Sequence, residues 1–184
     1  MAEMKAARAL PARASAAGWR MLDPQSCWSL RVDLLAATGP MTAAGLPIAV
    51  DACRAATRGE WSALWLGPDE QLLVGSDAAG TQLVPRLSEA LDGISHSLVD
   101  VSHRQAAIEL SGPGATRLLA MACPLDLDLA HAPVGFCTRT VYAKAEVVLW
   151  RQEAQRFQMQ AWRSLLPYVT GLLAIGSAEF SAGG

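Results

Sequence analysis

Residues 100–114 read Asp-Val-Ser-His-Arg-Gln-Ala-Ala-Ile-Glu-Leu-Ser-Gly-Pro-Gly, the most informative stretch of the chain for the fold. Apolar and polar residues alternate on both sides of a short polar turn, which predicts two strands, over 94–102 and 106–111. Proline is favoured at the first position of a helix, because its fixed φ suits that turn and its missing N–H has no helical partner there. Pro113 therefore predicts a helix, which Cys123-Pro124 ends.

Outward from this stretch, strand pairs alternate with single helices. Residues 60–66 and 71–75 are apolar runs around Gly67-Pro-Asp-Glu70, a turn sequence, and they predict a β-hairpin. Residues 136–142 and 145–150 alternate around Ala143-Lys144 and predict a second hairpin. No repeated β-α-β crossover is apparent. The sequence therefore predicts the α+β class, with helices packed on an antiparallel or mixed sheet.

Three weaker patterns complete this interpretation. Residues 28–35 alternate loosely and predict a strand. Leucines recur every four residues from 83 to 91, which predicts a helix, and Pro85 is tolerated only near a helix's first turn, so the helix should begin near Leu83. Residues 157–161 continue with period two, and Ser164 precedes an apolar run that predicts the last helix.

The length of 184 residues suits one domain, which we expect over 21–184, preceded by a flexible or partner-docked tail over 1–20. We find no sequence repeat or low-complexity linker. The tail is rich in arginine and alanine, a bias that organellar transit peptides share, but a tail is favoured. The chain is 52% apolar and 17% charged, with six tryptophans. Both a subunit with a permanent partner and a free domain with a large core fit this composition.

Several function classes are disfavoured. A net charge of −2 gives no basic surface for nucleic acid. The longest apolar run, 165–176, is shorter than the ~20 residues that span a bilayer, so no membrane role is expected. The cysteines lie too far apart in sequence for a typical zinc site, and separate thiols suggest a reducing cytoplasm. These are Cys27, Cys53, Cys123 and Cys137.

No catalytic or metal-binding residue is expected. The sequence lacks a Gly-x-Ser-x-Gly nucleophile motif, and His96, His103 and His131 lack the spacing of a zinc helix. Asp126 and Asp128 would project from one face of a strand, as paired acid and base carboxylates require. A polar face opposite buried leucines explains them more simply.

A binding region is predicted around Arg139, which could reach a carboxylate or a partner's acidic patch through its guanidinium fork. A solvated strand arginine is the simpler interpretation. Trp150 and Arg151 end the next strand and would frame the same edge, with Tyr142 nearby. These four residues form the candidate vestigial pocket or partner contact.

A family resemblance extends from Trp61 to the C-terminus. Residues 64–73 resemble the family's first hairpin, and residues 99–104 with 108–113 resemble the signature of the folate-binding aminomethyltransferase superfamily. Within that superfamily, further segments resemble the gamma subunit of heterotetrameric sarcosine oxidase. These segments are Cys123-Pro-Leu-Asp-Leu127, Cys137-Thr-Arg-Thr140 and Lys144-Ala-Glu-Val-Val-Leu-Trp150.

The resemblance implies the folate-binding-domain fold and an assembly with alpha, beta and delta subunits. That assembly oxidatively demethylates sarcosine to glycine and forms hydrogen peroxide and methylenetetrahydrofolate. FAD, FMN, NAD, zinc and tetrahydrofolate would be bound by the other subunits, and this chain would be a non-catalytic subunit of the oxidoreductase.

Differences from the related families leave three alternatives open. An active aminomethyltransferase has an Asp-Asp pair where this chain has residues 144–150, and the iron–sulfur maintenance branch has Lys-Gly-Cys-Tyr-x-Gly-Gln-Glu where it has 135–140. Cys137 as a reactive thiol is a minor alternative. A free-standing folate-binding or one-carbon transfer protein is another. The equivalent subunit of a related N-methyl amino acid oxidase or dehydrogenase is a third.

Overall fold

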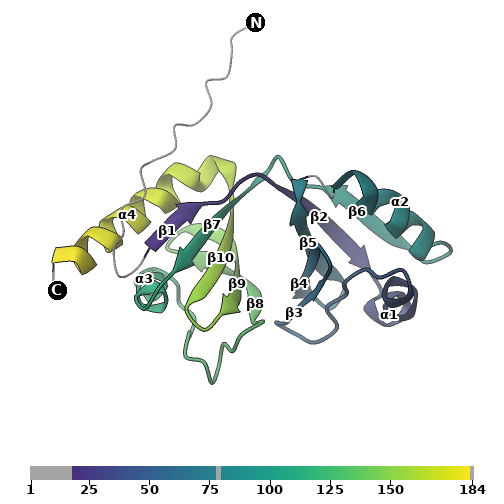
Figure 1. Cartoon of the computed structure of the whole chain (residues 1–184), viewed down its shortest axis with the longest axis horizontal. Coiled ribbons are helices and arrows are strands. Elements are labelled where there is room, and N and C mark those ends of the chain that lie inside the picture. The colour runs from purple at the N-terminus through teal and green to yellow at the C-terminus, as the bar shows by residue number, and fades with distance from the viewer. Residues whose placement is uncertain (1–17, 78–79, 183–184) are drawn as a thin grey trace, which may run out of the picture.

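The computed structural model describes residues 18–77 and 80–182, which form two five-stranded antiparallel sheets with helices on their outer faces (Figure 1). Sheet A has the strand order β1 (Gly18–Met21), β7 (Gln105–Ser111), β10 (Arg156–Trp162), β9 (Ala145–Glu153) and β8 (Cys137–Tyr142). Sheet B has the order β6 (His96–Asp100), β2 (Gln25–Val32), β5 (Glu70–Ser76), β4 (Trp61–Gly67) and β3 (Ala55–Arg58).

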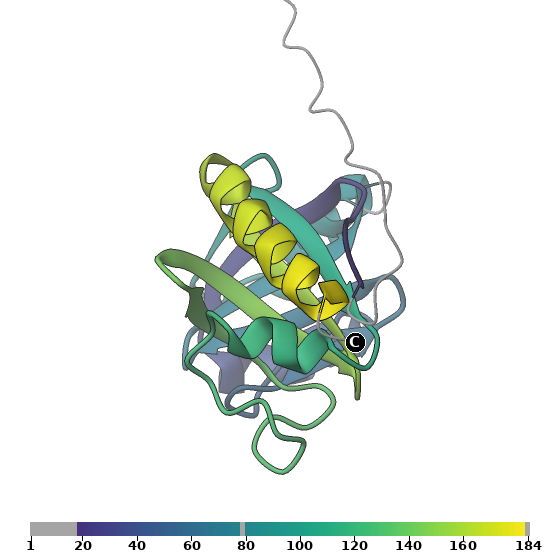
Figure 2. The same ribbon diagram turned by 90° about the vertical axis from the view of Figure 1, so that its left-hand side faces the viewer.

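The helices cover one face of each sheet. Sheet B carries α1 (Leu34–Ala43) and α2 (Gly80–Ala90), and sheet A carries α3 (Ala115–Ala120) and α4 (Leu166–Ala182), which the short 3₁₀ turn η2 (Arg163–Leu165) precedes. Figure 2 shows α4 and α3 side by side on sheet A. Each sheet and its helices enclose a hydrophobic core. The inner faces of the sheets share a third cluster, here called the seam, whose buried members are Cys27, Leu64, Leu72, Val74, Val101, Cys137 and Val148.

The chain is a structural repeat. The order β1-β2-α1-β3-β4-β5-α2 is followed by β6-β7-α3-β8-β9-β10-α4, and the two sheets have equivalent strand orders when β1 is matched to β6 and β7 to β2. Each unit also gives its first strand to the other unit's sheet. β1 pairs with β7 at one edge of sheet A, and β6 pairs with β2 at one edge of sheet B. This exchange joins the halves through the backbone as well as through the seam.

The predicted α+β class with antiparallel sheets is confirmed, and so are both hairpins. β4 pairs with β5 around Gly67, and β8 pairs with β9 around Ala143, whose φ of 52° fits the turn. The fold differs from the expectation in having two sheets. The repeat was invisible in the sequence, because equivalent positions need share only burial and not residue identity.

Several boundaries differ from the predictions, among them the start of α3, which is at Ala115 and not at Pro113. The strand expected over 28–35 ends at Val32, because the Asp33 carboxylate accepts hydrogen bonds from the N–H groups of Leu35 and Ala36 and so caps α1. Pro40 lies inside this helix, which the sequence analysis missed, as it missed β3.

The helix expected to begin near Leu83 begins at Gly80, which places Pro85 in its interior. Pro85 is exposed, so the carbonyl that loses its helical partner there is on the solvent side. The predicted tail extended to residue 20, but Gly18 to Arg20 belong to β1. The rest of the predicted tail, residues 1–17, lies outside the described residues.

Candidate functional site

The turn at Asp100-Val-Ser-His103 is where the chain passes from sheet B to sheet A. The Ser102 hydroxyl donates to the Asp100 carboxylate at 2.6 Å and accepts from the N–H of Cys27 in β2 at 2.9 Å. The backbone N–H of Val101 donates to the carbonyl of Cys27. The hydrogen bonds from the hydroxyl and backbone N–H of Ser102 lower the pKa of Asp100. Asp100, Val101 and Ser102, which belong to the superfamily signature, therefore hold the turn between the two sheets against β2.

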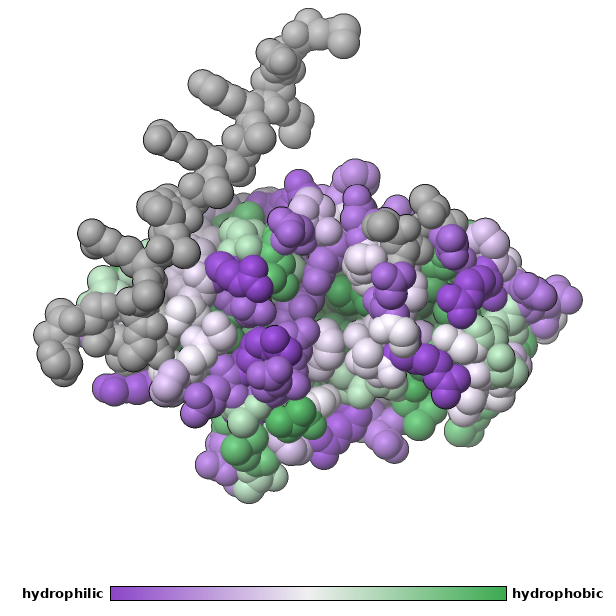
Figure 3. Space-filling view, viewed as in Figure 1, coloured by the Kyte–Doolittle hydropathy of each residue, from purple (hydrophilic) through white to green (hydrophobic). Residues whose placement is uncertain are grey.

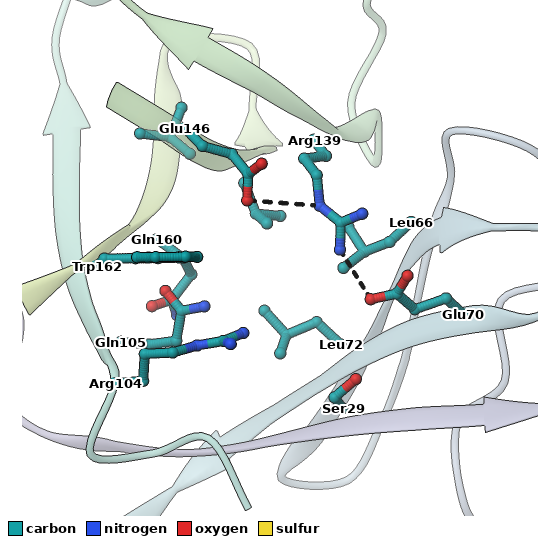
Figure 4. A pocket seen from close by; sticks show the side chains of 12 residues that line it. Ser29, Leu66, Glu70, Leu72, Arg104, Gln105, Arg139, Glu146, Gln160 and Trp162 are labelled. Atoms are coloured by element: carbon teal, nitrogen blue, oxygen red, sulfur yellow. Dashed lines mark hydrogen bonds and ion pairs between the residues drawn. The ribbon is translucent and has the colours of Figure 1, made fainter. Parts of the chain in front are cut away.

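A small pocket lies between the two sheets, next to the seam (Figure 4). Its volume is about 30 Å³, which suits about two water molecules. Ligand pockets for drug-sized molecules typically have roughly 300–1,000 Å³, so the pocket as formed does not accommodate a folate. Its lining comes from both sheets and from the turns that follow them, and comprises Ser29, Leu66, Glu70, Leu72, Arg104, Gln105, Arg139, Glu146, Val147, Val148, Gln160 and Trp162.

Arg139 lies in this pocket and bridges the sheets. Its guanidinium contacts Glu70 of β5 at 2.7 Å and lies 3.9 Å from Glu146 of β9 (Figure 4). The other oxygen of Glu70 accepts from Arg31 of β2 at 2.9 Å. The carboxylate that Arg139 reaches here belongs to the chain itself, and a role of Arg139 in binding a ligand or a partner stays a prediction. Two half-exposed arginines thus share the largely buried carboxylate of Glu70. Arg31 lies on the same sheet as Glu70, whereas the Arg139 pair joins sheet A to sheet B.

Glutamine side chains line the other side of the pocket. Gln25 of β2 accepts from Gln158 at 2.9 Å and from Gln160 at 2.8 Å, both of β10. The side-chain oxygens of Gln160 and Gln105 are buried, with no hydrogen-bond partner among the described residues. Acceptors beside a water-sized space are suited to ordered water. Nearby, the Arg104 guanidinium lies 5.1 Å from the centre of the Trp162 ring.

Arg151 is placed away from this pocket, on the outer side of sheet A. It is 1% exposed and donates to the carbonyls of Leu127 and Ala132, with Phe157 stacked 4.5 Å from its guanidinium carbon. Burial lowers its pKa, which the Asp128 charge partly offsets. Arg151 therefore anchors the loop between α3 and β8, and does not share a site with Arg139.

Tyr142 and Trp150 are also apart from one another. Tyr142 is buried in the core of sheet A, where desolvation raises its pKa to about 12 and its hydroxyl lies 3.4 Å from the carbonyl of Leu118. Trp150 packs against the seam. Of the four predicted binding residues, only Arg139 lines the pocket. Whether any of them contacts a partner stays a prediction.

The polar residues weighed as candidates for catalysis make local contacts. Asp126 and Asp128 lie in a loop and not on a strand, and each accepts a hydrogen bond from a backbone N–H two residues ahead. His131 pairs with Asp126 at 2.8 Å on the surface, and His96 contacts the carbonyl of Ile94. Within residues 18–77 and 80–182, no group of His, Cys, Asp and Glu side chains could hold a metal ion.

Two of the thiols are buried in the seam. Desolvation raises the pKa of Cys27 and of Cys137 to about 12. Only the thiolate is a strong nucleophile, so neither thiol is suited to covalent chemistry at neutral pH. In the part of the chain that the structure describes, no helix has the length and apolar character needed to cross a membrane.

Sequence reasoning missed most of the pocket. Glu70 was treated as part of a turn, and Gln105 and Gln160 carried no pattern of their own. Alternation places Gln158 and Gln160 on the polar face of their strand, and Gln105 precedes the strand expected over 106–111, so no local pattern indicated that all three are buried. Buried carboxamides need partners, so such positions indicate a polar contact inside the fold.

The two-sheet architecture has counterparts among solved structures. Aminomethyltransferase T of the glycine cleavage system from Bartonella henselae superimposes with a TM-score of 0.64, covering 88% of this chain and 46% of that one at 14% identity. This superposition shows that the chain has the same α+β fold as that part of the aminomethyltransferase.

The chain also matches one protein family in sequence. A family model described as "Sarcosine oxidase, gamma subunit family" matches residues 32–179. The sarcosine oxidase subunit gamma of Corynebacterium sp. (strain P-1) is 31% identical over 147 residues, covering 80% of this chain and 71% of that protein. That of Arthrobacter sp. is 37% identical over 111 residues, covering 60% and 53%. The chain belongs to the sarcosine oxidase gamma subunit family.

A solved assembly contains a similar chain. In heterotetrameric sarcosine oxidase from Corynebacterium sp. U-96, in complex with pyrrole 2-carboxylate, one chain superimposes with a TM-score of 0.80 at 28% identity. The superposition covers 91% of this chain and 87% of that chain.

Proposed function

We propose that this chain is the non-catalytic gamma subunit of a heterotetrameric sarcosine oxidase, an assembly that oxidatively demethylates sarcosine to glycine. The observation that carries the proposal is the family match over residues 32–179, joined to a superposition on a chain of such an assembly that covers 91% of this one. The assembly would form hydrogen peroxide and methylenetetrahydrofolate as its other products.

The geometry of the pocket supports a structural role. Arg139 pairs with Glu70 across the sheets and lies 3.9 Å from Glu146 within sheet A, and a volume of about 30 Å³ leaves no room for a folate. The crossover residues Asp100 and Ser102 are engaged with β2. We therefore derive no chemical step on this chain through folate.

The partners in this proposal are the alpha, beta and delta subunits. They would bind FAD, FMN, NAD, zinc and tetrahydrofolate, and the chemistry of those groups would take place on them. We place the assembly in the cytoplasm, in keeping with four thiols that all occur as free cysteines. This chain would contribute a surface that the other subunits bind, and its two sheets would hold that surface in a fixed shape.

Purification from the native host tests the proposal. The full chain, affinity-tagged, should elute from a sizing column far above its own 19.5 kDa, with flavin absorbance and with sarcosine-dependent release of hydrogen peroxide. A colourless 19.5 kDa monomer would contradict the proposal, and tetrahydrofolate titration of that monomer would then test the free-standing alternative. Activity with another N-methyl amino acid, and none with sarcosine, would indicate a related oxidase or dehydrogenase.

A further inference from the structure

The two long helices occupy equivalent positions in the repeat, so each is a control for the other. α2 follows β5 on sheet B, and α4 follows β10 on sheet A. Each buries two residues four apart against its sheet, Leu83 and Leu87 in α2, and Val169 and Leu173 in α4. Aligning these pairs places every residue of α2 opposite the residue of α4 that is numbered 86 higher.

In this alignment, the outer faces of the two helices differ in chemistry. The outer face of α2 is that of a helix in water, with Gln82, Arg86, Ser88 and Glu89 exposed over the leucines that it buries. It is therefore amphipathic, as expected of a helix that covers a sheet in a soluble domain.

The outer face of α4 is apolar. At the positions that match Gln82, Ser88 and Glu89, α4 has Tyr168, Ala174 and Ile175, of which Tyr168 is 41% and Ile175 59% exposed. Glu179 is the single charged residue in the 17-residue sequence of α4. A helix that is apolar on every side is normally buried on every side.

Close packing of α4 against α3 fixes the orientation of α4, so its apolar outer face points away from the sheet. A side chain on Gly176 would come within 2.6 Å of Leu118 in α3 and 2.9 Å of Met121, the residue after α3, so the two helices are in direct contact there. Met121 is itself 46% exposed and extends the apolar surface next to Gly176. We call the surface formed by Tyr168, Gly171, Ala174, Ile175, Ala178 and Met121 the α4 face. Figure 2 shows the helix α4 that carries it, in front of sheet A.

The chemistry of the α4 face selects among its possible occupants. The N-terminal segment 1–17 carries charged residues throughout its first 13 positions, Glu3, Lys5, Arg8 and Arg13, and is poorly matched to an apolar face whose single charged neighbour is the exposed Glu179. Helices that bind a membrane surface carry lysine or arginine on their polar side, and α4 has neither. An apolar protein surface matches better, because small and apolar residues lose little when they are desolvated.

We propose that the α4 face is the surface through which this chain docks on an apolar, uncharged surface of another subunit of its complex. The inference rests on the proposed function, because a gamma subunit requires a permanent contact with a different chain. A helix of 17 residues is about 25 Å long, so its outer face supplies the centre of such an interface and not its whole area. Tyr168 and Ile175 are its anchors, since large side chains near the centre of an interface carry most of the binding energy.

Two matched substitutions in the tagged full chain test this docking surface in the native host. Ala174→Glu puts a charge on the α4 face, and Ser88→Glu puts the same charge at the equivalent position of α2. We expect Ala174→Glu to reduce the co-purified flavin-bearing, sarcosine-oxidising subunits about tenfold or more, since the charge would be buried without a partner. Ser88→Glu should leave recovery within about twofold of wild type, because surface substitutions away from special features have small effects.

Controls separate docking from folding. The thermal midpoints of the two isolated variants should agree within a few degrees, and Ile175→Glu should reproduce the effect of Ala174→Glu. In unsubstituted protein, hydrogen exchange at α4 should be slower in the complex than in the isolated chain, whereas exchange at α2 should not change. Unchanged exchange at α4, or equal recovery of the complex with both variants, would overturn the proposal.

Other occupants have distinct signatures. An isolated wild-type chain that dimerises, with Ile175→Glu abolishing the dimer and sparing the complex, would assign the α4 face to a second copy. Faster exchange at α4 after deletion of residues 1–17, with the complex intact in Ile175→Glu, would assign it to the chain's own N-terminus. Either result would overturn this inference. If even the wild-type chain captures no flavin-bearing partner, the proposed function itself is wrong.

Discussion

Sheets A and B have the same topology and carry equivalent helices, yet α2 faces solvent with polar residues and α4 with apolar ones. The fold requires only that each helix bury one stripe against its sheet, a requirement that both helices meet. The chemistry of the other stripe is therefore free to differ. In this molecule, the difference between equivalent surfaces is more informative about function than either surface is alone.

The halves also differ in how a loop is tied to a sheet. In sheet B, the buried Gln71 of β5 accepts from the backbone N–H of Ala49 at 2.8 Å. In sheet A, the buried Arg151 of β9 donates to the carbonyls of Leu127 and Ala132. One anchor is neutral and accepts one hydrogen bond from its loop, and the other is charged and donates two. Substitutions at Arg151 and Gln71 test this contrast, and changes at Cys27, Cys137 and Glu70 test the contacts between the halves.

The largest effect is expected for Arg151→Met. Removing the guanidinium leaves two buried carbonyls without a donor, which outweighs the relief from burying a charge. The free energy of unfolding should fall by about 3 kcal/mol, measured by urea denaturation, and hydrogen exchange should accelerate in residues 124–136. Arg151→Lys keeps the charge but not the planar fork, and should recover only part of the loss. A change below about 0.5 kcal/mol would show that the loop does not depend on this anchor.

Alkaline pH should weaken the seam from both sides. Cys27 of sheet B and Cys137 of sheet A have pKa values raised from 9.0 to about 12 by desolvation. Between these values the unfolded thiols have lost their protons and the folded thiols keep them, so stability falls as pH rises. Each thiol contributes up to about 1.4 kcal/mol per pH unit.

Single alanine substitutions measure these contributions. Cys27→Ala and Cys137→Ala should each flatten the decline of unfolding free energy between pH 9 and 12. Tyr142, whose pKa is raised from 10.0 to about 12, leaves a residual slope in both variants. Equal slopes in wild type and both variants would mean that the thiols do not resist ionisation in the folded chain.

A smaller effect is expected for Gln71→Leu, the counterpart of the Arg151 change. It removes one hydrogen-bond acceptor from a buried N–H, which typically costs about 1–2 kcal/mol. It also removes a buried side-chain nitrogen that has no partner among the described residues, which offsets part of the loss. Urea denaturation should rank this variant as less damaged than Arg151→Met. The reverse order would break the proposed contrast between the two anchors.

The smallest effect is expected at Glu70, which pairs with Arg31 on its own sheet and with Arg139 on the other. Double-mutant cycles that combine Glu70→Gln with Arg31→Gln or with Arg139→Gln should each give a coupling below about 1 kcal/mol, because both arginines are substantially exposed. The Arg139 pair should be the stronger, since its arginine is 40% exposed and that of Arg31 57%. Both couplings should weaken at high salt.

The hairpins and the α+β class were accessible from sequence because their signals are local. Alternation on both sides of Gly67-Pro-Asp-Glu70 fixes a neighbouring pair of strands with a short connection, and β4 pairs with β5 as expected. The helix α1 was missed because Gly39 and Pro40 mark breaks in most sequences, whereas the Asp33 cap that begins this helix was not weighed.

The candidate binding residues show what local patterns omit. Arg139, Tyr142, Trp150 and Arg151 are near one another in sequence, but they lie in the pocket, the core of sheet A, the seam and a loop anchor. Adjacent strand residues point to opposite faces, so sequence proximity in β9 separates Trp150 from Arg151. The partner of Arg139, Glu70, is 69 residues away.

The sequence by itself determined the fold class, the hairpins, the family and the apolar character of 165–176, since each depends on residues that are close in the chain or on a recurring motif. Tertiary structure alone decided that β1 and β6 are exchanged, that the pocket's charges neutralise one another, and that the apolar helix leaves a face exposed. The physical reason is that burial and pairing depend on which distant segments meet. The packing of the whole chain decides which segments meet, and no local sequence pattern does so.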